Sequence, residues 1–389
     1  MGLAKKVPSR RMDPWVQQCA AEIARRAVRE LEALVAVSSP SGDVHGAEEC
    51  AALCAVLVPD EAQVERVPCS SAGHAPDVVA RLRGSGDRRV VLLGHIDTVI
   101  PHANHKPLAR DGEKLVGSGA VDMKGGVVLA LGAMRALARA PERYAEVALV
   151  LVGDEEWRTA PFVHAARFAG WDACLCFEAG ERTPDGGEGV VVRRKAAGTI
   201  RITARGRAAH SGSAPDRGRN ALLALASAAQ IVARCHDPGG PHRLTAVPTV
   251  MRSGDAFNVV PGRGELTCDI RADVTEAILG VLDAVPAEIE GVALATEPVR
   301  LWPGMDAAAA TAGLLDSASG LLGREVGGVA RGGASDASHF AESMPITVDG
   351  LGPRGGAAHN PEEYVLADSL HERAEVALAV IAAALDGRY

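Results

Sequence analysis

The chain has 389 residues, a length that predicts two or three compact domains with ample apolar core. Hydrophobic residues make up 47% and charged residues 23% of the sequence, a composition that excludes general disorder. The formal net charge is −8, so the chain lacks the positive field that attracts nucleic acid or an anionic membrane. We therefore expect neither of them as a partner.

We expect a cytoplasmic protein. The longest apolar run, residues 376–385, is far shorter than the roughly 18 to 20 residues that cross a bilayer. The basic residues near the N-terminus are followed by a charged helical segment and not by an apolar signal core. The sequence has eight cysteines and no paired CxxC motifs. This pattern favours buried thiols in a reducing compartment over a disulfide framework.

Apolar strand-like runs alternate with helical patterns along most of the chain. Residues 1–12 are polar and basic, and we expect a mobile arm there before a helix that begins near Asp13-Pro14. The alternation that follows predicts an α/β domain with a mixed, largely parallel sheet and flanking helices. The expected strands cover residues 90–94, 147–153, 173–177 and 345–349, and the expected helices cover 124–138, 161–168, 311–322 and 368–385.

The order of predicted strands and helices changes between residues 196 and 304. The order there is strand (198–206), helix (219–234), strand (244–251), strand (258–271), helix (275–289) and strand (292–301). This β-α-β-β-α-β order predicts an α+β two-layer sandwich inserted into the first domain. We therefore expect a discontinuous domain at 13–195 and 305–389, and an inserted domain at 196–304.

Polar side chains follow several of the apolar strands at the point where each strand ends. His95 and Asp97 follow the first strand, Asp154-Glu155-Glu156 follow the next, and Glu178 follows the third. In open α/β sheets the ligand site lies outside the carboxyl ends of the strands. We therefore expect these side chains to converge.

Two further residues extend this set. Asp122 lies in the glycine-rich segment 117–126 that opens a helix, and it is the candidate bridging ligand. His359 follows a glycine-rich turn and supplies a second imidazole. Two His, one Asp and two Glu without Cys favour a pair of zinc ions, with cobalt or manganese as substitutes. The expected metal ligands are His95, Asp122, Glu156, Glu178 and His359.

A charge balance assigns the remaining acidic residues. Two divalent cations are neutralised by three carboxylate ligands and one bridging hydroxide, which leaves Glu155 free. A carboxylate beside a metal-activated water can take its proton and pass it to a leaving amine, so Glu155 is the candidate general base. Asp97 is placed to orient the imidazole of His95. Each residue alone could be structural, and it is their combination that favours a metal centre.

Five motifs carry a resemblance to a known family: His95-x-Asp97-Thr98-Val99, Gly117-x-Gly119-x-x-Asp122-x-Lys124-Gly125, Glu155-Glu156, Glu178, and His359 with Glu363-Tyr364-Val365. From about residue 30 to its end, the chain resembles the co-catalytic zinc aminoacylases and carboxypeptidases, the M20 peptidases. The resemblance implies amide hydrolysis by a catalytic α/β domain with an inserted lid. It also implies that His95, Asp122 and Glu178 hold one zinc and that Asp122, Glu156 and His359 hold the other, with Glu155 as general base.

Segments 177–180, 192–198 and 209–215 look most like the glutamate-carboxypeptidase branch of that family. Segment 332–336 departs from the branch pattern, because it keeps Gly332-Gly333 and Asp336 but has Ser335 where the branch has Thr. Within this branch, Asn258 and Arg271 match positions that bind the terminal carboxylate of a small N-acyl amino acid or peptide substrate. His210 matches a histidine that enters the partner subunit's site, so the resemblance implies a homodimer formed through the lid.

Alternatives remain at the level of the branch and of single residues. N-acyl amino acid deacylases of the acetylornithine and succinyl-diaminopimelate types share every metal ligand. A catalytically silent binding protein is a more remote alternative, because all ligands and the base are present. Arg271 could instead pair with Asp269 or Asp273, and His210 could cap the helix that follows it.

Overall fold

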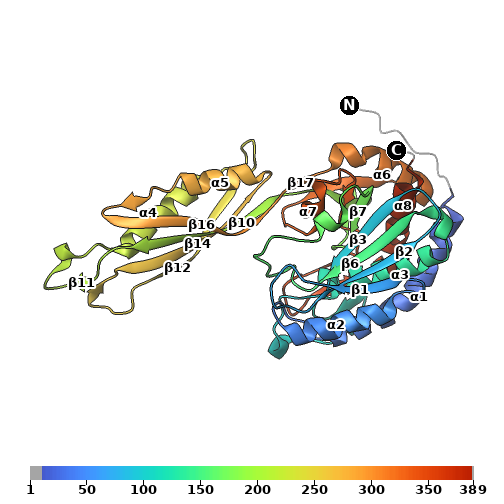
Figure 1. Ribbon diagram of the computed structural model, residues 1–389, viewed down its shortest axis with the longest axis horizontal. Helices are drawn as coiled ribbons and strands as arrows, with labels where there is room; N and C mark the ends of the chain where they lie inside the picture. The colour runs from blue at the N-terminus through green and yellow to red at the C-terminus, as the bar shows by residue number, and fades with distance from the viewer. Residues whose placement is uncertain (1–10, 388–389) are drawn as a thin grey trace. The chain divides into compact units, whose positions relative to one another are not determined.

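The computed structural model describes residues 11–387 (Figure 1). Most of the arm expected at 1–12 therefore lies outside the described residues. The first helix, α1 (Pro14–Ala36), begins where Pro14 favours a helix start, and the Asp13 side chain caps it by accepting hydrogen bonds from the backbone N–H groups of Trp15 and Val16. Across the described residues, no helix combines the length and apolar character needed to cross a membrane.

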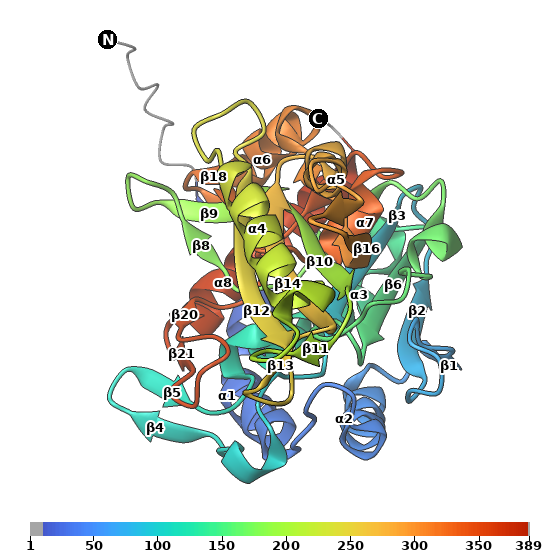
Figure 2. The ribbon, with the colours of Figure 1, turned by 90° about the vertical axis from the view of Figure 1, so that its left-hand side faces the viewer.

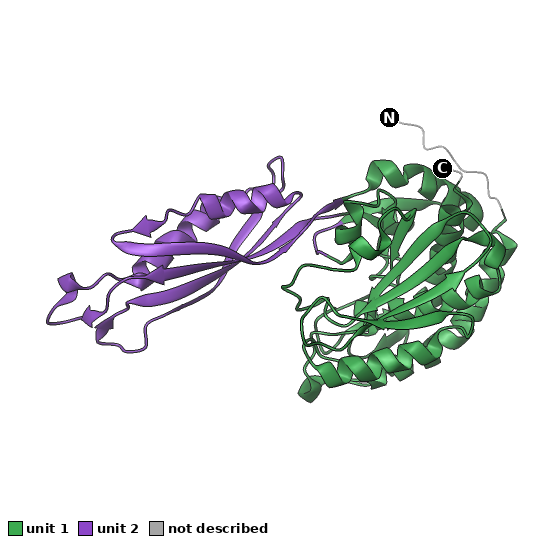
Figure 3. Ribbon diagram, viewed as in Figure 1, with its two compact units in different colours: residues 1–193, 306–330, 335–389 green, residues 194–305, 331–334 purple. Residues whose placement is uncertain are grey.

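The chain folds into two compact units (Figure 3). Unit 1 comprises the residues up to 193 together with 306–330 and the residues from 335 onward, and unit 2 comprises 194–305 and 331–334. Assigning the catalytic role to unit 1 and the lid role to unit 2 stays a prediction.

Unit 1 is built on a six-stranded sheet with the order β1-β2-β6-β3-β7-β19. The pairs β6–β3, β3–β7 and β7–β19 are parallel, whereas β2 pairs antiparallel with both of its neighbours. The predicted mixed, largely parallel sheet is confirmed. Its strands are β1 (Gln63–Val67), β2 (Asp77–Arg83), β3 (Arg89–His95), β6 (Glu146–Val152), β7 (Ala173–Cys176) and β19 (Thr347–Val348).

Helices flank this sheet and bury its apolar side chains. Helices α3 and α8 contact β3, α1 packs on α3 and α8, and α7 contacts β7 and β19 (Figure 1). Val90 and Leu92 of β3 are completely buried in the resulting core, which explains why these strands read as continuous apolar runs. The helices are α1, α2 (Val44–Leu57), α3 (Gly125–Ala138), α6 (Ala308–Leu322), α7 (Ala337–Ala341) and α8 (Ser369–Asp386).

Two small sheets complete the strand pairing around unit 1. One has the order β17-β9-β18 with β8 paired to β9, and the other has the order β20-β21-β5-β4. Their strands are β4 (Ala109–Asp111), β5 (Lys114–Val116), β8 (Glu181–Arg182), β9 (Glu188–Arg194), β17 (Met305–Asp306), β18 (Val326–Arg331), β20 (Gly355–Gly356) and β21 (Tyr364–Leu366).

Unit 2 contains a five-stranded antiparallel sheet, β12-β14-β10-β16-β15, with α4 and α5 packed on it. Figure 2 shows α4 lying along β12 and β14. The main elements follow the expected β-α-β-β-α-β order. They are β10 (Ala196–Arg205), β11 (Ala209–His210), α4 (Ala221–Arg234), β12 (Thr245–Ser253), β13 (Val259–Val260), β14 (Arg263–Ala272), α5 (Thr275–Asp283), β15 (Glu288–Ile289) and β16 (Val292–Trp302).

Two expected elements of unit 2 are shorter than predicted, and a proline explains each case. The strand expected at 258–271 is interrupted at Pro261, which has no N–H for the ladder, so that β13 pairs with β11 while β14 joins the main sheet. The helix expected at 275–289 ends at Asp283, because the residue before Pro286 is disfavoured in helical conformation.

The helix expected at 161–168 is wrong. Only the single turn Ala165–Phe168 is helical there, and the segment before it is a loop. The N–H of Val163 donates to Ser70 Oγ, and the buried imidazole of His164 pairs with Asp77 at 2.8 Å. These two long-range contacts stabilise the loop, and they replace the hydrogen bonds that a helix would have formed.

All eight cysteines lie in the described part of the chain, and none of them forms a disulfide there. Cys174 and Cys176 are buried in β7, as expected for a strand core.

Candidate metal centre

The predicted residues lie at the carboxyl ends of three adjacent parallel strands, β6, β3 and β7. His95 is the last residue of β3, Glu155 and Glu156 follow β6, and Glu178 follows β7. Because β3 lies between β6 and β7, the three strand ends are adjacent.

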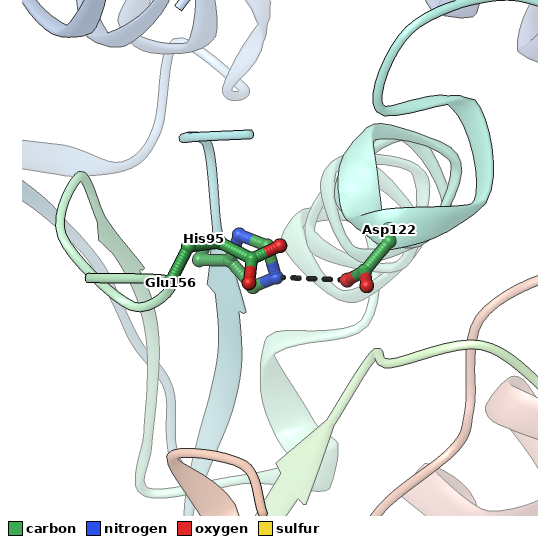
Figure 4. Close-up of side chains that lie close together, drawn as sticks. All are labelled: His95, Asp122 and Glu156. Atoms are coloured by element: carbon green, nitrogen blue, oxygen red, sulfur yellow. Dashed lines mark hydrogen bonds and ion pairs between the residues drawn. The ribbon is translucent and has the colours of Figure 1, made fainter. Parts of the chain in front are cut away.

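Asp122 lies between two imidazoles. Its Oδ1 is 3.2 Å from His95 Nε2, and its Oδ2 is 3.1 Å from His359 Nε2. Glu178 Oε1 lies 3.6 Å from His95 Nε2, and Glu156 Oε1 lies 3.3 Å from His359 Nε2. Figure 4 shows the Asp122 carboxylate facing the His95 imidazole, and the Glu156 carboxylate overlaps that imidazole in this view. The structure thus brings together all five predicted ligands, with one Asp122 oxygen facing each imidazole.

The turn that carries Asp122 is fixed by a buried carboxylate. Asp122 has φ −124° and ψ 90° within the irregular turn Ala120–Lys124, and its peptide bond to Met123 is cis. Glu363 accepts hydrogen bonds from the backbone N–H groups of Gly119, Val121 and Asp122 at 2.8 to 3.1 Å. Its side chain therefore takes the place of the helical acceptors that this turn lacks.

Asp97 contacts both the first imidazole and the segment that carries the candidate base. Its Oδ1 is 3.3 Å from His95 Nδ1, which agrees with the predicted orienting role. In addition, its two oxygens accept the backbone N–H groups of Glu155 and Glu156 at 3.2 and 3.1 Å. Sequence reasoning missed this second contact.

A fully buried arginine holds the same segment from the other side. Arg158 NH1 lies 2.8 Å from Asp154 Oδ1, and NH2 of the same residue pairs with Asp336. Asp154 also accepts hydrogen bonds from the backbone N–H and the hydroxyl of Ser71. Asp154 and Arg158 lie four residues apart in one turn, but the partner Asp336 is 178 residues away, so no local pattern predicts this pair.

The cluster concentrates negative charge in a buried place. Burial raises the pKa of Glu155 well above its ordinary value, and the neighbouring charge of Glu156 adds to this effect. Asp122 and Glu156 raise the pKa of His359 to about 11. Burial would raise the pKa of Asp122, but hydrogen bonds from His359 and His95 hold it below its ordinary value. A site that binds protons this strongly on its imidazoles attracts cations.

The donor set fits zinc. It consists of imidazole nitrogens and carboxylate oxygens without sulfur, and candidate donor atoms of His95, Asp122 and Glu156 lie within 4.8 Å of one another. The His95 side chain is only 2% exposed, whereas the His359 side chain is 56% exposed. The centre is therefore anchored on a buried strand end and open to solvent on its His359 side.

The three remaining predicted residues belong to unit 2. His210 lies on β11 opposite Val259 of β13, and its Nδ1 accepts the backbone N–H groups of Gly212 and Ser213. Asn258 is exposed beside this ribbon, and its backbone oxygen accepts the N–H of Ser211. The side chain of Asn220, not His210, caps α4.

Arg271 lies near the other end of β14 and pairs with Asp269 at 3.0 Å. This ion pair is one of the two pairings that the sequence left open.

Comparisons with known proteins agree with the fold and the site. A family model described as peptidase family M20/M25/M40 matches residues 91–383. Carboxypeptidase G2 of a Pseudomonas species is 24% identical over 392 residues, covering 96% of this chain and 92% of the relative. Succinyl-diaminopimelate desuccinylase of Methylorubrum populi is 31% identical over 339 residues, covering 78% and 84%. The crystal structure of a tripeptidase from Staphylococcus aureus is similar with a TM-score of 0.74 at 21% identity, covering 93% and 99%.

These matches define a hydrolase of a metal-dependent class that typically uses zinc. The chain belongs to the M20/M25/M40 peptidase family, and the resemblance inferred from its motifs is confirmed.

Proposed function

We propose that the protein is a dinuclear zinc hydrolase that cleaves an amide bond next to a free α-carboxylate, in the manner of a glutamate carboxypeptidase. The observation that carries the proposal is the placement of Asp122, whose two oxygens face His95 and His359 at 3.2 and 3.1 Å. A carboxylate in this position can bridge two cations. His95 and Glu178 would complete one zinc site, and His359 and Glu156 would complete the other.

Bound zinc ions would polarise the substrate carbonyl and activate water at neutral pH. Glu155 would accept the proton of that water and deliver it to the leaving amine. Glu155 is suited to this role by its position, because it is buried and directly adjacent in sequence to the candidate ligand Glu156. Asp97 would hold Glu155 and His95 in fixed positions relative to each other, because it contacts the His95 imidazole and the backbone N–H of Glu155.

Arg271 and Asn258 are proposed to bind the substrate carboxylate. Because β14 separates them within one chain, the two side chains can reach the same carboxylate only if the proposed homodimer supplies one of them. Arg271 already holds a carboxylate, that of Asp269, through contacts from both Nε and NH2. A guanidinium offers planar, two-point recognition that suits a substrate carboxylate equally well. The match to carboxypeptidase G2, which covers nearly the whole chain, supports a substrate of this class.

Deacylation of an N-acyl amino acid is the second candidate. It is favoured by the higher identity to a succinyl-diaminopimelate desuccinylase, 31% against 24%, although that match covers less of the chain. Purified protein assayed in parallel on an N-acyl-glutamate and on N-succinyl-diaminopimelate separates the two reactions. A protein that turns over neither, nor any of a panel of dipeptides and N-acyl amino acids, would instead be a binding protein.

We further propose a cytoplasmic homodimer formed through unit 2. Its edge strand β12 exposes Val247, Val250 and Met251, and Phe257 in the following loop is completely exposed. Exposed apolar side chains on an edge strand favour pairing with a second chain. In such a dimer, His210 would serve the partner's site as an oxyanion donor. Free cysteines throughout the described chain agree with a reducing compartment.

The test of the main proposal uses two neighbouring glutamates as a matched pair. Glu155→Gln should retain two zinc equivalents and lose turnover on the order of 10²-fold or more, because it removes only proton transfer. Glu156→Gln should lose one equivalent, because it removes a ligand. Metal content by mass spectrometry and turnover of the preferred substrate measure both effects. Loss of metal in Glu155→Gln together with full activity in Glu156→Gln would reverse the two roles.

A further inference from the structure

A hollow of about 320 Å³ lies between α1 and α3, in a part of unit 1 that contains no residue of the metal centre. The residues that line it recur three and four positions apart on each helix, so both helices present one face to it. At the floor of the hollow, Gly132 of α3 allows Ile23 of α1 to approach closely, since a Cβ at position 132 would lie 2.7 Å from the Ile23 side chain. The floor is therefore tightly packed, while the rim is formed by long side chains.

The rim is strongly basic. Four arginines line the hollow, two from α1, one from α3 and one that follows α3 directly, and only one acidic residue, Glu22, lines it with them. This concentration of positive charge stands out in a chain whose formal net charge is −8. The four arginines are Arg25, Arg26, Arg135 and Arg139.

Arg135 of α3 and Arg139, which follows this helix directly, have protein partners. Arg135 donates to the backbone oxygen of Leu57 and pairs with Glu30 at 2.7 Å, and its side chain is 16% exposed. Arg139 pairs with Glu22 at 2.5 Å. The guanidinium group of Arg135 therefore has a fixed position at one side of the hollow, whereas Arg139 is more exposed, at 54%.

The two arginines of α1 differ from them. Arg25 and Arg26 are exposed, and within residues 11–387 neither has a carboxylate partner in an ion pair. Their charge remains available to a ligand.

We propose that this hollow binds a small multivalent anion that carries a phosphate group. Arginine recognises phosphate through two parallel N–H···O hydrogen bonds, and guanidinium groups from two helices can contact several oxygens of one anion. The volume lies at the lower end of the roughly 300 to 1,000 Å³ typical of small-molecule sites, which suits a compact ligand. Arg25 and Arg26 supply the charge that the protein leaves unpaired, and Arg135 supplies a fixed donor.

The test uses the zinc-loaded protein and inorganic phosphate. Isothermal titration with potassium phosphate, at an ionic strength held constant with potassium chloride, should give a saturable signal. Arg25→Gln/Arg26→Gln should weaken the affinity by about tenfold or more, the equivalent of losing one charge-assisted hydrogen bond. Arg29→Gln is the matched control, because Arg29 is also an exposed arginine of α1 but does not line the hollow, and it should leave the affinity within about twofold.

A phosphate monoester, glycerol 3-phosphate, identifies the source of the phosphate group. Tighter binding of the ester would assign the hollow to a phosphorylated small molecule, and tighter binding of inorganic phosphate would assign it to the free anion. Three results overturn the proposal. They are a response that potassium chloride alone reproduces, a phosphate affinity that survives Arg25→Gln/Arg26→Gln and so belongs elsewhere, and an equal loss in Arg29→Gln.

Discussion

Arg158→Met should strongly destabilise the protein, because it leaves two buried carboxylates without their cation. The side chains of Arg158 and Asp154 are 0% exposed, and that of Asp336 is 4% exposed. Removing one partner of a buried ion pair costs about 3 to 5 kcal/mol, since the remaining charge keeps its desolvation penalty. Methionine fills much of the same volume, so the loss reports charge more than packing.

The control is an arginine whose ion pair is exposed. Arg193 pairs with Asp306 at 3.0 Å, but the two side chains are 53% and 66% exposed. Arg193→Met should cost less than about 1 kcal/mol, because water screens such pairs. Urea unfolding followed by tryptophan fluorescence is suitable, since three of the four tryptophans lie in unit 1.

Neutralising one of the two carboxylates provides a second measurement. Arg158→Met/Asp336→Asn should recover part of the stability that Arg158→Met loses, because one of the two uncompensated carboxylates is now neutral. If Arg158→Met cost no more than Arg193→Met, or if the second substitution brought no recovery, the reasoning from buried charge would be refuted.

Three further predictions concern the proposed chemistry. Chelation should abolish activity, and Zn²⁺ or Co²⁺ should restore it; full turnover by metal-free protein would contradict the mechanism. Arg271→Ala should lower kcat/KM for free-acid substrates more than for the corresponding amides, measured side by side, whereas equal losses would indicate a structural arginine. His210→Ala should lower kcat by roughly 10²-fold with zinc content intact. Mixing it with Glu155→Gln should restore part of the activity after subunit exchange, and exchange without recovery would exclude action across a dimer.

The strand-end residues were predictable because their signal is local. His95, Asp154-Glu155-Glu156 and Glu178 each follow an apolar run directly, and the topology of parallel sheets brings such ends together. The sheet was predictable for the same reason, since buried parallel strands are apolar throughout. The edge strand β1 and its neighbour β2 are not predicted from the sequence, because β1 is short and mostly exposed and β2 carries charged residues at both ends.

The supports of the site could not be read from the sequence in the same way. Glu363 binds the turn of Asp122 from 241 residues away, and Arg158 binds Asp336 from 178 residues away. Glu363 belongs to a sequence motif, but nothing in its sequence neighbourhood indicates that its carboxylate accepts backbone N–H groups. Such contacts depend on tertiary packing, which no local pattern encodes.

Asp97 shows how the local and long-range signals combine. Its separation from His95 suggested one contact, but its carboxylate has several acceptor positions, and the structure uses them for Ser41, for the N–H groups of Glu155 and Glu156, and for His95. One anion thus fixes the distance between a candidate ligand on β3 and the candidate base after β6. Proton transfer depends on that distance, because a general base acts only within hydrogen-bond reach of the proton it abstracts. Because Glu155 and Glu156 are adjacent in the chain, the Asp97 carboxylate can accept both of their backbone N–H groups. Asp97 thereby holds the candidate base and a candidate ligand together.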